Sequence, residues 1–158
     1  MTKIEDMSEP QRQSWITLLA DGAVFIWFWK HMTGNFGLTP KAFTPSELGV
    51  FFIQFIIITI IVHTGIAIAF ELRKRKAEFQ KDERDIDIAR RGSHAGYRGL
   101  QIGLGIIVVT LILQYIVGSD YHGAISVIEP VEMVFALCGV SYLADLYRHA
   151  VILWGYRS

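Results

Sequence analysis

The most constraining feature of this chain is an apolar block at residues 48–70, which holds 23 residues and no formally charged side chain. About 20 apolar residues in a helix cross the roughly 30 Å hydrocarbon core of a bilayer. A lone spanning segment is helical, because hydrocarbon offers no partners for its backbone hydrogen-bonding groups. The block therefore predicts a transmembrane helix, and the rest of the chain has to fit a membrane protein.

Three further apolar blocks lie at residues 15–32, 99–117 and 125–154. Hydrophobic residues make up 52% of the 158 residues, and they are gathered into blocks as in membrane proteins rather than dispersed as in soluble ones. We expect an all-α polytopic membrane protein with four transmembrane helices in an antiparallel bundle, forming one domain over residues 1–158. The predicted helices cover about residues 14–33, 46–78, 84–118 and 124–154.

Basic residues are concentrated between the second and third blocks. Residues 73–91 contain eight lysines and arginines, whereas the loop before the second block has Lys41 and the loop after the third block has none. Basic loops of membrane proteins stay in the cytoplasm. The charged segment 71–91 is therefore predicted to be cytoplasmic, and four spans then place the N- and C-termini in the cytoplasm as well.

Several protein classes are not indicated. The first residues lack the apolar core of a cleavable signal peptide, and Cys138, the single cysteine, has no partner for an intramolecular disulfide. The formal net charge is zero, so no general basic surface for nucleic acid is expected. The chain has no Walker-type phosphate loop, nucleophile elbow or serine–histidine–aspartate arrangement. We therefore expect a protein that is not an enzyme and does not bind nucleic acid directly.

Residues 81–105 carry two stripes at helical spacing. One consists of small residues: Ala89, Gly92, Gly96, Gly99 and Gly103. Small residues at this spacing let helices approach closely in a membrane. We expect the four glycines to form a packing face, either inside the four-helix unit or in a homodimer. The other stripe is polar and roughly opposite: Asp87, Arg91, His94, Arg98 and Gln101.

The predicted topology places polar residues from all four helices in the cytoplasmic half of the membrane. A stripe on the fourth helix is expected to face the polar stripe of the third, so that Asp145 pairs with Arg98, for which Asp21 is a competing partner. Charges inside a membrane are costly and pair with one another. The structural alternative is that the long side chains extend to the interface. The expected intramembrane cluster consists of Asp21, His63, His94, Arg98, Asp145 and His149.

Histidine and carboxylate side chains also indicate a metal site, since three or four such ligands hold zinc or another divalent ion. The stronger candidates are His63, Asp145 and His149, and a weaker outer group consists of His31, His122, Glu129 and Glu132. Neither group contains a motif such as HExxH. Two histidines can alternatively ligate a b-type haem, so the sequence leaves the cofactor unknown.

A short motif, Asp82-Glu83-Arg84, precedes the third predicted helix and is followed by Ile88 and the basic pair Arg90-Arg91. With the four-helix layout, it resembles a family of small bacterial membrane proteins that has no assigned activity. The resemblance covers about half of the chain and implies a location in the bacterial inner (cytoplasmic) membrane. Some such proteins look like partners of small helix-turn-helix regulators. The resemblance thus implies a soluble cytoplasmic partner, and the predicted partner surface is Asp82, Glu83, Arg84 and Asp87.

Three functions follow from these expectations. The favoured one is a non-enzymatic sensor or regulatory module in the lipid bilayer that acts through the charged segment 71–91. The second is a small transporter or channel with a polar path along Asp21, His63, Arg98 and Asp145. Four helices are few for a complete path, so this function requires a homo-oligomer, with a dimer favoured. The third is a metal- or haem-binding membrane protein.

Overall fold

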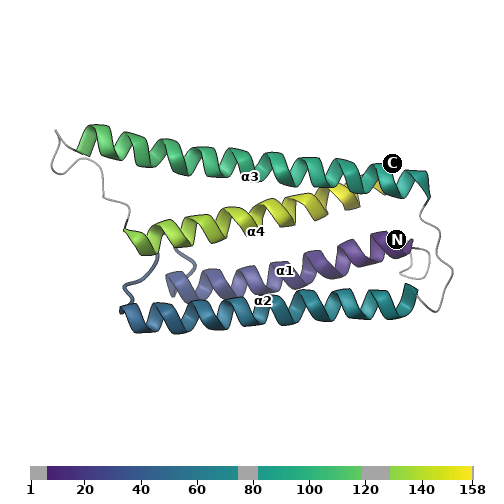
Figure 1. Ribbon diagram of the computed structural model, residues 1–158, viewed down its shortest axis with the longest axis horizontal. Coiled ribbons are helices and arrows are strands. Elements are labelled where there is room, and N and C mark those ends of the chain that lie inside the picture. Colours follow the sequence, from purple (N-terminus) through teal and green to yellow (C-terminus); the bar gives the residue numbers. More distant parts are fainter. Residues whose placement is uncertain (1–6, 75–81, 119–128, 158) are drawn as a thin grey trace.

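The computed structural model describes residues 7–74, 82–118 and 129–157, and the regular elements in these ranges are all α-helices. They are α1 (Glu9–Thr33), α2 (Pro45–Lys74), α3 (Glu83–Gly118) and α4 (Pro130–Gly155). Successive helices run in opposite directions, and the start of α1 lies at the same end of the molecule as the end of α4 (Figure 1). The prediction of an all-helical chain is confirmed.

Three of the four helices are long and apolar enough to cross a membrane, over Pro45–Leu72, Glu83–Ile116 and Pro130–Gly155. α1 has 25 residues, or about 38 Å at 1.5 Å per residue, but it carries Asp21 and Lys30 within its length. The structure thus agrees with an integral membrane protein. The fourth span and the cytoplasmic position of the termini stay predictions.

The starts of α1 and α2 are set by capping residues, and both lie slightly before the predicted positions. Ser8 Oγ accepts a hydrogen bond from the Gln11 N–H at 3.4 Å, so α1 begins at Glu9 rather than near residue 14. Glu47 Oε2 accepts from the Thr44 N–H at 2.9 Å, and the Glu47 N–H donates back to Thr44 Oγ1 at 3.3 Å. This reciprocal cap starts α2. The predicted boundaries at residues 78 and 124 lie outside the described residues.

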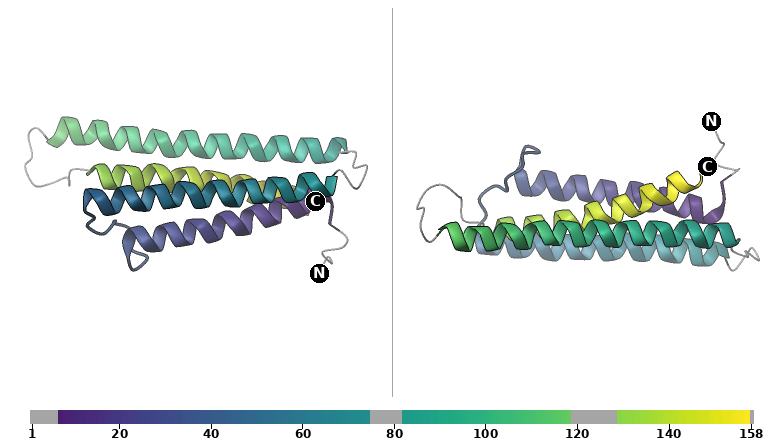
Figure 2. Two further views of the ribbon diagram at one scale, coloured as in Figure 1. Left: turned by 60° about the horizontal axis from the view of Figure 1, so that its bottom comes forward. Right: turned by 90° about the horizontal axis from the view of Figure 1, so that it is seen from above.

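Extensive contacts occur between α3 and α4, between α4 and α1, and between α1 and α2. α2 and α3 follow each other in the sequence, yet they lie at the two opposite sides of this array in the view of Figure 1. Seen from above, α2 and α3 overlap and α1 lies to one side of both (Figure 2, right). α4 packs against both α1 and α3. It is therefore the helix that joins the two halves of the molecule.

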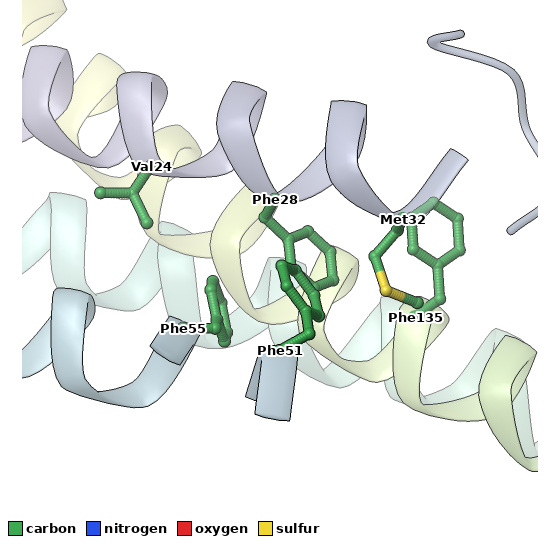
Figure 3. Close-up of a cluster of buried hydrophobic side chains, with 6 residues drawn as sticks. All are labelled: Val24, Phe28, Met32, Phe51, Phe55 and Phe135. Atoms are coloured by element: carbon green, nitrogen blue, oxygen red, sulfur yellow. The ribbon is translucent and has the colours of Figure 1, made fainter. Parts of the chain in front are cut away.

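A core of large apolar side chains joins α1, α2 and α4 in the half of the molecule where α1 ends (Figure 3). Its buried members are Val24, Phe28, Met32, Phe51, Phe55 and Phe135. Phe28 is fully buried, and its ring centroid lies 4.7 Å from that of Phe55 and 5.8 Å from that of Phe135. Rings at these separations attract each other through their edges and faces. Because the distance between packed helices depends on the side chains at the contact, these wide rings keep the three helices apart.

The predicted glycine stripe of α3 packs on α4 of the same chain. A Cβ atom on Gly96 would lie 2.8 Å from Arg148 Cβ and 3.2 Å from the carbonyl oxygen of Ala144. Cβ atoms on Gly92 and Gly103 would collide with side chains of α4. The sequence allowed this stripe to pack either inside the four-helix unit or in a homodimer. The structure shows the packing inside the chain. A homodimer stays a prediction and requires a different surface.

Candidate metal centre

Four ionisable side chains from three helices meet between α1, α2 and α4, and we call them the acid–histidine cluster: Asp21, His63, Asp145 and His149. His63 Nε2 lies 3.2 Å from Asp21 Oδ1. On α4, Asp145 and His149 are four residues apart and share one face, with His149 Nε2 3.7 Å from Asp145 Oδ2. One potential ligand atom each from Asp21, Asp145 and His149 lie within 4.8 Å of one another.

Asp21 is the most unusual member of the cluster. Its side chain is 1% exposed, and neither carboxylate oxygen has a hydrogen-bond partner. The contact with His63 has an ion-pair distance but lacks hydrogen-bond geometry. His149 Nδ1 is also buried without a partner. Burying a carboxylate without compensation is costly, and a positive charge next to Asp21 would offset that cost.

The orientation of His63 leaves one ring nitrogen directed at the cluster. Its Nδ1 lies 2.9 Å from the carbonyl oxygen of Thr59, and because a carbonyl only accepts, Nδ1 carries the hydrogen. In the neutral ring, Nε2 then presents a lone pair 3.2 Å from Asp21 Oδ1. Metal-binding histidines have this arrangement, with one N–H donated to a carbonyl and the other nitrogen free to bind.

The surroundings of the cluster both brace it and leave it accessible. The Tyr142 hydroxyl lies 2.8 Å from Thr59 Oγ1 and joins α4 to α2 beside the cluster. The His63 side chain is 45% exposed, which opens the cluster on the α2 side. A hollow of about 270 Å³ between α3 and α4 is lined in part by Asp145. The cluster is thus bordered by an exposed ring on one side and by this hollow on the other.

The polar stripe of α3 does not face α4, and the predicted pairing of Asp145 with Arg98 is wrong. The glycines occupy the side of α3 that packs on α4, so the polar residues on the opposite side point away. His94 and Arg98 are exposed and line a surface groove. Asp145 has its ion pairs within its own helix, with Arg148 and His149. Of the six predicted cluster members, His94 and Arg98 thus lie apart from the other four.

The weaker outer group does not converge in the described chain. His31 stacks on Phe51, with the ring centroids 4.2 Å apart. Glu132 accepts a hydrogen bond from the Glu129 N–H at 3.1 Å and so helps to start α4. His122 lies outside the described residues. Within residues 7–74, 82–118 and 129–157, the group of three potential ligands that does converge is Asp21, Asp145 and His149.

The predicted partner surface lies at the start of α3, where its exposed members are Asp82, Glu83 and Arg84. Asp87, the fourth member, forms ion pairs with the arginines one turn later in α3. Between them, Asp85 Oδ1 accepts a hydrogen bond from the Tyr156 hydroxyl at 2.7 Å, which joins the start of α3 to the end of α4. Burial, together with this hydrogen bond, raises the pKa of Tyr156 to about 12.

Comparison with protein-family models, with curated proteins and with solved structures finds no match for this chain. The functional proposal therefore depends on the chemistry of the cluster itself. Two of its features were not predicted. Asp21 was expected as an ion-pair partner rather than a metal ligand, although its depth in α1 resembles that of Asp145 in α4. Thr59 was not singled out, although it precedes His63 by one helical turn.

Proposed function

We propose that this protein is a non-enzymatic membrane sensor that binds a divalent transition-metal cation in the acid–histidine cluster. Metal binding changes the charged segment 71–91, and a soluble partner responds to that change. The observation that supports the proposal is Asp21, a fully buried carboxylate whose two oxygens lack hydrogen bonds and lie beside a second carboxylate. Two carboxylates in a water-poor site repel each other, and either a shared proton or a bound cation removes that repulsion. The two histidines beside the carboxylates favour the cation.

The side chains of the cluster favour one class of cation. Two carboxylates and two imidazoles suit zinc and similar transition metals, whereas calcium and magnesium prefer sites made of oxygen ligands. Zinc binds such ligands at about 2.0–2.2 Å in a tetrahedral arrangement. The potential ligand atoms of Asp21, Asp145 and His149 are within 4.8 Å of one another, so zinc binding draws them together by on the order of 1 Å. Because these ligands come from α1 and α4, and His63 of α2 lies beside Asp21, this contraction moves helices relative to one another.

Two helices connect the cluster to the charged segment. α2 continues from His63 into the charged segment and ends there at Lys74. α4 carries Asp145 and His149 and packs on α3, whose first residues form the last part of the charged segment. Movement of α2 or α4 is thereby passed to the residues expected to contact a soluble partner. This connection makes a sensor the better proposal than a metal store.

The first experiment measures metal in detergent-purified protein and its affinity for added zinc. We expect one zinc per chain in the wild type, and an affinity at least about ten-fold lower in Asp21→Asn and His149→Gln, since ligands and their supports contribute about 10- to 100-fold. His94→Gln is the matched control, because His94 lies outside the cluster. Unchanged zinc binding in Asp21→Asn contradicts the site. A Soret band that disappears in His63→Ala assigns haem in place of zinc.

The second experiment tests the output. Glu83→Cys is introduced into a Cys138→Ala background, and its rate of maleimide labelling is measured in vesicles with and without zinc. We expect zinc to change the labelling rate, and the addition of Asp21→Asn to remove that change. A rate that zinc leaves unaltered, in protein shown to bind zinc, contradicts a sensor.

A transporter is the second candidate, and the two openings of the cluster favour it. His63 is partly exposed on one side and the hollow between α3 and α4 reaches Asp145 on the other. A transporter predicts zinc uptake into proteoliposomes that is lost in Asp145→Asn, with labelling at position 83 independent of zinc. Flux and labelling therefore separate the two functions.

A further inference from the structure

A basic groove lies along α3 at the edge of its contact with α4. It has a volume of about 760 Å³, and its lining includes Arg90, Arg91, His94, Arg98, Ile102 and Tyr147. Tyr147 comes from α4 and forms one wall, while the other five residues follow one another along α3. The groove is separate from the acid–histidine cluster, which lies among α1, α2 and α4.

The groove carries more positive than negative charge. Arg90 and Arg91 both contact Asp87, at 2.8 Å and 2.6 Å. Arg98 is exposed, and among the residues that the structure describes no carboxylate pairs with it. The three arginines are thus accompanied by a single carboxylate, which pairs with two of them. A phosphate group suits this site, because guanidinium groups bind its oxygens through paired hydrogen bonds.

The groove changes from basic to apolar along the axis of α3. Arg98 is the last charged residue before residues 99–116, which contain none. It lies about 23 Å along the helix from Glu83, at 1.5 Å per residue. One turn further, Ile102 is 65% exposed and continues the lining of the groove. This order, with cations at the membrane boundary and an apolar surface beyond them, matches the order of phosphate and acyl chain in a phospholipid.

We infer that this groove binds an anionic phospholipid of the leaflet next to the charged segment. Its phosphate contacts Arg98, supported by His94 about one turn earlier and by Arg90 and Arg91 about two turns earlier. One acyl chain lies along Ile102 against α3. A soluble phosphate compound fits less well, since it uses the basic half of the groove and leaves the apolar half empty. Anionic headgroups are bound by basic pockets of this kind between membrane helices.

The test is native mass spectrometry of the detergent-purified full chain, titrated with short-chain phosphatidylglycerol or phosphatidylcholine. We expect the wild type to prefer phosphatidylglycerol. Arg98→Gln lowers the affinity for phosphatidylglycerol about five-fold and lowers that for phosphatidylcholine by less, because the choline of phosphatidylcholine offsets its phosphate charge. Because Arg98 is exposed, this variant is expected to fold, and circular dichroism checks it.

Arg84→Gln is the matched control, because it removes the same charge at an exposed position outside the groove. It lies about 21 Å before Arg98 along the helix, well beyond the range of unscreened charge interactions in physiological salt. We expect no loss of lipid preference in this variant. An equal loss in Arg84→Gln assigns the preference to general surface charge and overturns the proposal. Displacement of the lipid by inorganic phosphate overturns it in favour of a soluble ligand. The inference does not depend on the metal site, and Asp21→Asn is expected to keep the lipid preference.

Discussion

The two sides of α4 are packed by opposite means. Towards α3 the contact is made by glycines, with Gly96 so close to α4 that even a methyl group has no room. Towards α1 and α2 it is made by aromatic rings around Phe28. At Gly92, Gly96 and Gly103 the close contact has no space for further side chains. The wide one holds three helices apart and leaves room beside the rings for the acid–histidine cluster. Polar chemistry inside this molecule is thus found where bulky residues set the helix spacing.

The largest expected effect is from removing the central ring of the wide contact. Phe28→Ala leaves a cavity among Phe51, Phe55 and Phe135, and we expect a loss of about 3 to 5 kcal/mol in the free energy of unfolding. Denaturant titration in mixed micelles measures it. Ile26→Ala is the control on the same helix, because Ile26 is 57% exposed. An equal loss of unfolding free energy in the two variants would show that the rings do not determine the stability of the contact among α1, α2 and α4.

Zinc is expected to stabilise the packing of α1, α2 and α4 around the acid–histidine cluster. At a zinc concentration about 100 times the dissociation constant, binding to the folded state adds about 2.7 kcal/mol to its stability. Thermal unfolding with and without zinc measures this gain. In Asp21→Asn the gain should vanish, while the metal-free stability stays equal or rises because a buried charge is removed. A zinc effect that survives in Asp21→Asn would assign it to another site.

Replacing a glycine with a larger residue tests the close contact between α3 and α4. Gly96→Leu forces α3 away from α4, and overpacking of this kind costs about 1 to 3 kcal/mol. Gly105→Leu is the matched control on the same helix, since a Cβ atom there meets nothing within 4 Å. Thermal unfolding of the two variants gives the comparison. If Gly105→Leu is as damaging as Gly96→Leu, the α3–α4 contact is not what stabilises α3.

The smallest expected effect concerns the hydrogen bond from Tyr156 to Asp85. Tyr156→Phe removes it and should cost about 1 kcal/mol. The folded protein holds the phenolic proton up to about pH 12, from an ordinary pKa near 10. The contribution of this group to stability is therefore complete below about pH 10 and is lost as the pH rises from 10 towards 12. Tyrosinate absorbance should show a component near pH 12 that is missing in Tyr156→Phe. Tyr115→Phe, at a position 84% exposed, should leave that component in place.

The sequence was sufficient to predict the helices, because long apolar blocks and glycine spacing act locally. It also predicted that Gly92, Gly96, Gly99 and Gly103 share a packing face, and in the structure a Cβ atom on each of them would meet α4. It was not sufficient to predict which stripe of α3 faces α4. Both the glycine stripe and the polar stripe were assigned contacts, but they lie on opposite sides of one helix. Close packing on the glycines decides the outcome, and it directs Arg98 away from Asp145.

The candidate site was predicted only in part, because the sequence does not show how each helix is turned about its own axis. Periodicity places Asp145 and His149 on one face of α4, but it does not say how α1 and α2 are turned towards that face. The aromatic rings fix this rotation, and they bring Asp21 and His63 to the same place. Contacts among residues so distant in sequence depend on the whole packed arrangement. Asp21 therefore emerged as a potential ligand only from the three-dimensional structure.

The position of α4 has a consequence for biosynthesis. The ribosome delivers the helices in the order α1, α2, α3 and α4, but α2 and α3 lie on opposite sides of the finished molecule. An emerging chain can pair α1 with α2, whereas α3 has to wait for the last helix before it acquires its main neighbour. Assembly is thus completed from the carboxyl end. A nascent chain halted before residue 130 lacks both the partner of its glycine face and two of its four cluster residues.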